Sequence, residues 1–70
     1  MQKWEYVTLT QIYNRDDEKY FWADDDADER GAIQRLNEEG QEGWELVAVH
    51  SPRHFGSTGG NLYFLKRPTD

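Results

Sequence analysis

The chain begins with a stretch over residues 3–13 that is rich in β-branched and aromatic side chains and contains no glycine or proline. These residue types favour a strand. The apolar positions do not follow one simple alternation. Trp4 and Tyr6 share one face of the expected strand, whereas Val7 and Leu9 share the other. Either both faces are partly covered, or a β-bulge lies between Tyr6 and Val7.

A polar turn over residues 14–19 is followed by the aromatic run 20–22. A connection of this length suits a hairpin, so the aromatic run is either a short strand folded back on the first or a loose flap. The glycine-rich segment that precedes the last strand has no pattern of its own. We therefore expect mobile loops over residues 14–28 and 52–60. Within the first of them, residues 20–22 are the stretch that could instead form the short strand.

The pattern over residues 28–39 predicts one amphipathic helix. The aspartates before it are typical of a helix N-terminus, where unpaired backbone N–H groups attract negative charge. Asp25 or Asp26 is the expected N-cap, and Gly40 is expected to end the helix in the left-handed conformation. The expected inner face consists of Ala32, Ile33 and Leu36.

Two further strands are expected over 43–52 and 61–67, each ended by a proline, Pro52 and Pro68. They form a hairpin, and compactness places the first strand beside the C-terminal one. The chain of 70 residues is therefore expected to be a single α+β domain. Its sheet is small and mainly antiparallel, has three or four strands, and is covered on one face by a single helix.

Three motifs stand out: KWEY at 3–6, LNEEGQEGWEL at 36–46 and FLKRP at 64–68. Together they resemble a family of short, mostly bacterial domains, the domain of unknown function 4177. That family typically shows W-E-Y, L-N-x-x-G-x-E-G-W-E-L and an end similar to F-K-R-P. This chain departs from the pattern in the inserted stretch 20–28 and in Leu65. The resemblance implies a small α+β domain and no particular activity.

The motif residues have a structural interpretation beside this resemblance. Leu36 is expected to dock the helix, two glycines to turn the chain, and an indole to fill the junction between helix and sheet. The residues expected to act in this way are Trp4, Leu36, Gly40, Gly43 and Trp44.

Composition narrows the function classes. The net charge of −6 and the pI near 4.7 argue against a general binder of nucleic acid or anionic membranes. The sequence contains neither a long apolar run nor a leader pattern, so we expect a cytoplasmic protein with no membrane segment. It contains no cysteine, which excludes disulfides, thiolate zinc sites and a cysteine nucleophile.

The patterns typical of metal sites and enzymes are incomplete. Alternating aspartates over 24–28 resemble the start of a calcium loop, but Glu29 stands where glycine is needed and Arg35 where glutamate is needed. His50 and His54 are separated by a proline and do not share a helix face. The serines lack the spacing of a catalytic triad. We therefore expect no catalytic residue, no cofactor and no metal.

The large aromatic content, 14% of the chain, exceeds what one helix and a small sheet can cover. The sequence thus predicts a non-catalytic interaction module that binds a protein partner or forms a homodimer. The candidate partner-binding residues are Tyr20, Phe21, Trp22 and Phe55.

Three alternatives stay open. The first is an acidic decoy that occupies a basic site on another protein, using Asp16, Asp17, Glu18 and residues 24–29. The second is a small-ligand site or an enzyme, which requires a formed pocket. The third is a basic and aromatic face for single-stranded nucleic acid, which the acidic net charge disfavours. Its residues would be Arg53, Phe55, Tyr63, Phe64, Lys66 and Arg67.

Overall fold

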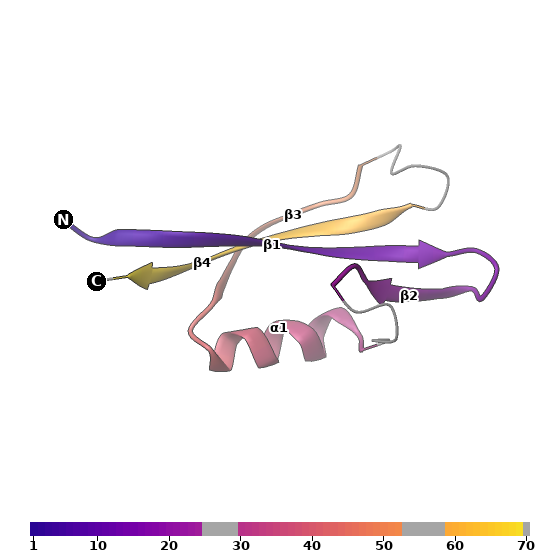
Figure 1. Ribbon diagram of the computed structural model, residues 1–70, viewed down its shortest axis with the longest axis horizontal. Coiled ribbons are helices and arrows are strands. Elements are labelled where there is room, and N and C mark those ends of the chain that lie inside the picture. Colours follow the sequence, from indigo (N-terminus) through magenta and orange to yellow (C-terminus); the bar gives the residue numbers. More distant parts are fainter. Residues whose placement is uncertain (25–29, 53–58, 70) are drawn as a thin grey trace.

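A computed structural model of the chain describes residues 1–24, 30–52 and 59–69. It has a four-stranded antiparallel sheet and one helix, which confirms the α+β fold expected from the sequence (Figure 1). The elements in chain order are β1 (Lys3–Asn14), β2 (Lys19–Trp22), α1 (Ala32–Gln41), β3 (Glu45–His50) and β4 (Gly60–Thr69). In the described part of the chain, no helix has the length and apolar character needed to cross a membrane.

The strand order in the sheet is β2-β1-β4-β3, with every neighbouring pair antiparallel. The expected neighbours are confirmed: β1 lies beside β4, and β3 and β4 form a hairpin. The aromatic run is a strand, β2, paired with the end of β1. β1 pairs with β4 from Lys3 to Ile12 without a register shift, so the bulge considered after Tyr6 is absent. A register shift lies instead in β3, between Leu46 and Ala48.

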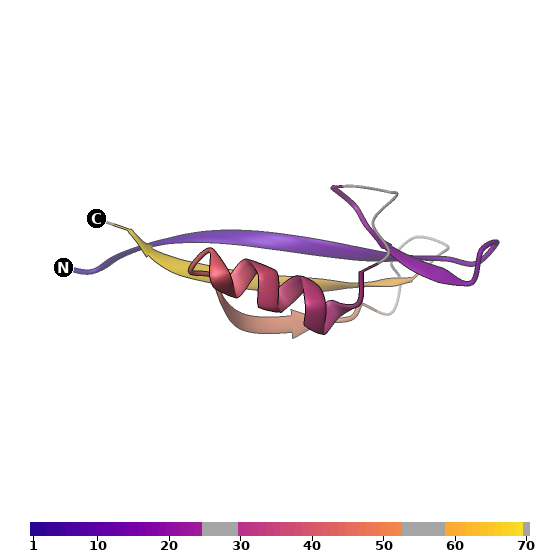
Figure 2. The same cartoon turned by 90° about the horizontal axis from the view of Figure 1, so that it is seen from below.

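The helix covers one face of the sheet. Figure 2, seen from below, shows α1 in front of the strands, and Figure 1 shows it on the lower side only. We call the side that faces α1 the covered face and the other side the open face. Because side chains alternate along a strand, the odd-numbered residues of β1 and β4 lie on the covered face and the even-numbered ones on the open face.

The core lies on the covered face and is small. Its buried hydrophobic members are Leu9, Trp22, Tyr63 and Leu65, with Val7, Ala32, Leu36 and Trp44 packed against them. The radius of gyration is 13.3 Å, whereas a compact domain of this length has about 11 Å. The molecule is therefore elongated, and a large share of its side chains stays at the surface.

The helix differs from its expected form at the N-terminus. It begins at Ala32 rather than at residue 28, and its N-cap is Gly31, which makes no side-chain cap bond. The expected caps at residues 25 and 26 lie outside the described residues. On the inner face, Arg35 takes the place expected for Ile33, which is 73% exposed. The reason is geometric: positions three and four residues from Ala32 share its side of the helix, and the next residue along does not.

The end of the helix also differs. Gly40 remains helical, and Gly43 adopts the left-handed conformation with φ of 91°. The Trp44 N–H donates to the Glu39 carbonyl (3.1 Å), and the Gly43 N–H donates to the Gly40 carbonyl (3.0 Å). These two bonds form a Schellman motif, in which glycine avoids the strain that a Cβ would cause. The motif directs Trp44 onto the core.

The last strand does not end at Pro68. β4 continues to Thr69, with Pro68 opposite Trp4. The Tyr13 N–H donates to the Gly59 carbonyl, which indicates that the odd-numbered residues bond across β1 and β4. The backbone groups of even-numbered β4 residues therefore face β3. Since β3 begins opposite Lys66, proline at position 68 removes no ladder bond.

Candidate functional site

The middle of the open face carries mainly aromatic, aliphatic and threonine side chains, whereas the charged Lys19 and Glu45 lie on the same face toward its borders, on β2 and β3. The chain has 14 acidic and 8 basic residues, yet Lys66 is the one charged member of the central open-face set. That set comprises Trp4, Tyr6, Thr8, Thr10 and Ile12 of β1, Phe21 of β2, Ala48 of β3, and Leu62, Phe64 and Lys66 of β4. Interface cores are enriched in aromatic residues and depleted of charge in the same way.

Three large side chains of this face are in contact with solvent. Tyr6 is 70% exposed, and Trp4 and Phe64 are exposed to a smaller degree. The Lys66 Nζ lies 4.3 Å from the centroid of the Trp4 ring, a cation–π contact that holds the indole against the sheet. Trp4, which the motif interpretation treated as structural, thus lies on the open face rather than in the core. The signal that could have found this face is the uncharged even-numbered positions of the first strand, which are aromatic, threonine or isoleucine.

Besides the outer edge of the four-residue strand β2, two strand edges are free among the described elements. β3 is the outermost strand on the other side of the sheet, and all six of its residues are exposed. β1 has a second free edge at residues 3–9, because β2 pairs only with Gln11–Asn14. A hollow of about 400 Å³ lies at this second edge, lined by residues 7–10, Ala23 and Asp24. Unpaired strand edges are templates for pairing with another chain.

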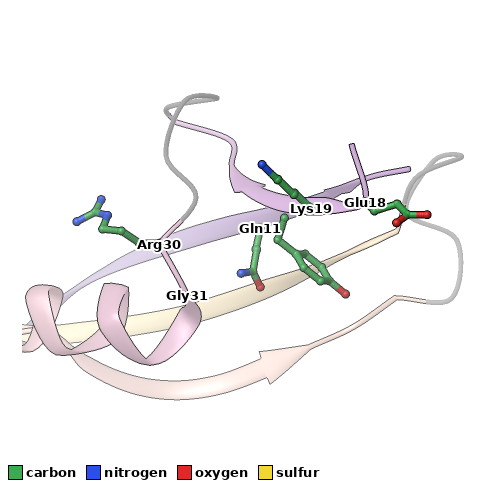
Figure 3. A pocket seen from close by; sticks show the side chains of 6 residues that line it. Gln11, Glu18, Lys19, Arg30 and Gly31 are labelled. Carbon is green, nitrogen blue, oxygen red and sulfur yellow. The ribbon is translucent and has the colours of Figure 1, made fainter. Parts of the chain in front are cut away.

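A second hollow, of about 410 Å³, lies at the far end of the covered face and is lined by Gln11, residues 18–20, Arg30 and Gly31. The buried Gln11 Oε1 accepts hydrogen bonds from the Tyr63 hydroxyl (2.9 Å) and the Asn61 Nδ2 (3.1 Å). Figure 3 shows that Glu18, Lys19 and Arg30 point away from one another. The charged groups do not converge on a common point, as they do around a bound ligand or a reacting atom.

An arginine lies in the packed layer between α1 and the sheet. Arg35 is 6% exposed, and its guanidinium carbon lies 5.0 Å from the Trp22 ring centroid. It donates to both carboxylate oxygens of Asp24 (3.3 and 2.8 Å) and to Glu39 (3.2 Å). The hydrogen bonds that Arg35 donates to Asp24, followed by the interaction with Glu39, raise the pKa of Arg35 in spite of its burial. The cluster joins the end of β2 to the helix.

The structure separates the expected partner-binding residues. Trp22 is completely buried, and its Nε1 donates to the Arg30 carbonyl (2.8 Å), so it cannot contact a partner in this fold. Tyr20 lies on the same face as Trp22 but farther out, beside Tyr13. Phe21 points to the open face. Phe55 lies outside the described residues.

The central motif packs against the core. Leu36 and Trp44 are half-buried beside the buried cluster. The Arg67 guanidinium lies 4.3 Å from the Trp44 ring centroid, donates to the Glu42 carbonyl (3.1 Å) and forms an ion pair with Glu5. Arg67 thereby ties the end of the helix to the sheet. Arg67 belongs to the motif at 64–68, so this motif packs against the central one.

The basic and aromatic face considered for nucleic acid does not form. Tyr63 and Arg67 lie on the covered face, whereas Phe64 and Lys66 lie on the open face, because they alternate along one strand. The other two members of that set lie outside the described residues. The same holds for residues 25–29 of the proposed acidic decoy; Asp16, Asp17 and Glu18 are exposed in the turn after β1.

His50 is exposed on β3, and His54 lies outside the described residues. Within the ranges that the structure describes, no three His, Asp or Glu side chains are grouped as metal ligands would be.

Comparison of the chain with models of protein families, with curated proteins and with solved structures gives no significant match. The resemblance drawn from the three motifs stays a prediction.

Proposed function

We propose that the protein is a small, non-catalytic interaction module that binds another protein chain through the open face of its sheet. The observation that carries this proposal is the contrast between a strongly charged chain and an apolar face on which Trp4, Tyr6 and Phe64 are exposed. Aromatic side chains supply large contact area at low cost in conformational entropy, which makes them frequent hot spots in protein interfaces.

The chemistry of this face favours a protein as the partner. Binding to nucleic acid depends on several cations that neutralise phosphates, and the central open face offers only Lys66. The ammonium of Lys66 is already placed over the Trp4 ring. A flat surface of aromatic and threonine side chains suits a protein surface with apolar anchors and a few hydroxyl or amide groups.

The small core supports the same proposal. Few hydrophobic side chains are fully buried, and a single core in a chain of this size supplies only about 3–5 kcal/mol of stability. A partner seated on the open face would cover the aromatic side chains that α1 leaves exposed. The diverging side chains around the larger hollow support a non-catalytic role.

The test is quantitative affinity capture from a lysate of the cell that produces the protein. Tyr6→Lys and Phe64→Lys place a charge in the open face, and Ile33→Lys places the same charge on the exposed side of the helix. We expect wild type and Ile33→Lys to retain the same bound protein, and the two open-face variants to lose it by about tenfold or more, as for interface hot spots. Circular dichroism checks that all variants are folded. Equal capture by all four proteins would refute the open face as the binding surface.

A further inference from the structure

We propose that β3 pairs with β3 of a second copy of this chain, so that two four-stranded sheets join edge to edge across a two-fold axis. This inference rests on the proposed function as an interaction module, and it names a partner for a different surface, the outer edge of the sheet. β3 is an edge strand whose six residues are all exposed. An isologous contact of this kind uses the same patch on both copies and closes after two.

The sequence of β3, ELVAVH, is complementary to itself when two copies run antiparallel. In the register centred on the strand, Glu45 lies opposite His50 of the second copy, and Leu46 lies opposite Val49. The two central residues, Val47 and Ala48, lie opposite each other. Every cross-strand pair is then apolar with apolar, or acid with imidazole.

The faces of the sheet agree with this register. Glu45 and His50 lie opposite Lys66 and Leu62 of β4, so both are on the open face. Leu46 and Val49 lie opposite Leu65 and Tyr63, so both are on the covered face. Directly opposed residues of antiparallel strands must point to the same face, and the bulge between Leu46 and Ala48 is what brings all four into agreement.

The directions of the backbone N–H and C=O groups of β3 also agree with this register. Even-numbered β4 residues direct their N–H and C=O groups toward β3, so their partners Glu45 and His50 bond inward. The N–H and C=O groups of Leu46 and Val49 therefore point outward, away from β4. In the proposed register these two residues face each other across the axis and can exchange both hydrogen bonds, twice per dimer.

The side chains at the ends of β3 are also complementary. The two-fold pairing sets a Glu45 carboxylate beside a His50 imidazole at each end of the interface, where an imidazole N–H can donate a hydrogen bond to the carboxylate. In the pairing of β1 about Tyr6, the middle of its free edge, Lys3 and Glu5 would face Leu9 and Val7, which offer no polar group.

The second copy would also cover apolar side chains that this chain leaves in water. Val47 and Val49 are 54% and 52% exposed, values that are high for β-branched residues in a strand. Charged side chains, prolines and bulges are the usual protection of edge strands that stay single. β3 has Glu45 at its first position and a bulge between Leu46 and Ala48, but none of its residues is a lysine or a proline.

The first experiment determines the register of the two β3 strands by disulfide trapping. Because the chain has no cysteine of its own, an introduced cysteine can form a disulfide only with another introduced cysteine. Glu45→Cys and His50→Cys are made as separate, exposed variants and oxidised alone or mixed in equal amounts. Opposed residues that do not bond to each other lie about 4.5 Å apart between Cα atoms, within disulfide range. Two copies of the same position lie about 17 Å apart. We expect the mixture to form a covalent dimer at least tenfold faster than either variant alone.

The second experiment measures the dissociation constant by sedimentation. Val47→Lys brings two ammonium groups near the axis and is expected to weaken the dimer at least tenfold. Ile33→Lys, the same change on the outer side of α1, is expected to leave the dissociation constant unchanged. His50→Glu places two carboxylates opposite each other and is expected to weaken the dimer about tenfold. The double variant Glu45→Lys with His50→Glu places an ammonium opposite a carboxylate, so it is expected to restore the dimer.

The outcomes separate this inference from the proposed function. A chain that stays monomeric and gives no mixed disulfide overturns the β3 dimer and leaves binding through the open face intact. A dimer that Phe64→Lys disrupts and Val47→Lys does not would also overturn it, because the copies would then stack through their open faces. Trapping of the mixture alone, together with sensitivity to Val47→Lys, supports the β3 pairing.

Discussion

The two faces of the sheet carry similar side chains, which are buried on one face and exposed on the other. On the covered face, Trp22, Tyr63 and Leu65 are buried beneath the helix. On the open face, Tyr6 and Phe64 lie at equivalent positions of the same two central strands and are exposed. One helix can cover one face of a small sheet, and the described part of the chain provides a single helix.

The two faces differ in what they contribute to the stability of so small a molecule. The covered face holds the packed side chains, the buried Arg35 and the Schellman motif at Gly43. The stability of the fold therefore depends mainly on contacts at this face. The open face adds exposed aromatic side chains that contribute little to folding, and we propose it as the surface that contacts another protein. The following variants test this division, from the largest expected effect to the smallest.

Neighbouring residues of β4 give the sharpest contrast. Leu65 is 1% exposed, so Leu65→Ala removes buried contacts and is expected to lower the free energy of unfolding by about 2–5 kcal/mol. Phe64→Ala, on the open face, is expected to lower it by less than about 1 kcal/mol. Urea unfolding followed by circular dichroism at low protein concentration measures both. Equal losses would mean that the open face is covered in the isolated chain, and the division of roles would fail.

The buried arginine tests whether the covered face depends on charge as well as apolar contact. Arg35→Ala removes the guanidinium from the Trp22 ring and leaves the Asp24 carboxylate without it. We expect a loss of about 2 kcal/mol, in the range measured for hydrogen bonds to charged groups. Gln34→Ala, one position along on the exposed side of the helix, is the matched control. A change below about 0.5 kcal/mol for both variants would assign Arg35 no role in stability.

The pH dependence of stability should also come from the covered face. Burial, followed by the charge of Tyr20, raises the pKa of Tyr63 above its ordinary value of 10.0. The folded chain then holds this proton more tightly than the unfolded chain does. The contribution is therefore complete below about pH 10 and is lost as the pH rises through the raised pKa. Tyr63→Phe is expected to flatten this alkaline decline.

At neutral pH the same substitution is expected to cost about 1 kcal/mol, because it removes the hydrogen bond to Gln11. Tyr6→Phe is the control, because it removes a tyrosine hydroxyl from the exposed open face. Urea midpoints measured from pH 7 to pH 11 give both quantities. An unchanged alkaline decline in Tyr63→Phe would show that another group causes it.

The two glycines at the end of the helix give the smallest effects, with opposite signs. Gly43→Ala forces a Cβ into the left-handed region and is expected to cost about 1 kcal/mol. Gly40→Ala places a methyl group where nothing lies within 4 Å, inside a helix, and is expected to gain up to about 1 kcal/mol. Thermal unfolding measures both. The same sign for both variants would contradict the Schellman motif.

Local patterns in the sequence determined most of the elements. Strand propensity predicted the long first strand, the aromatic run 20–22 left a short strand and a loose flap both open, and the motif 36–46 predicted a helix end followed by a strand. These features depend on contacts between residues near in sequence, or on residue types that suit a pleated surface. For that reason the α+β class could be predicted before any coordinates, whereas the neighbours in the sheet were inferred from compactness.

Only the tertiary structure decided which face of each strand meets the helix. β1 has apolar residues on both of its sides, so the pattern alone could not assign Leu9 to the core and Tyr6 to the surface. The burial of Arg35 depends on Asp24 and Trp22, which approach it from another element. The self-complementary edge of β3 depends on the bulge at Leu46–Ala48 and on the place of this strand at the end of the sheet. A single chain position has two possible faces, and which one is buried is set by partners far away in the sequence.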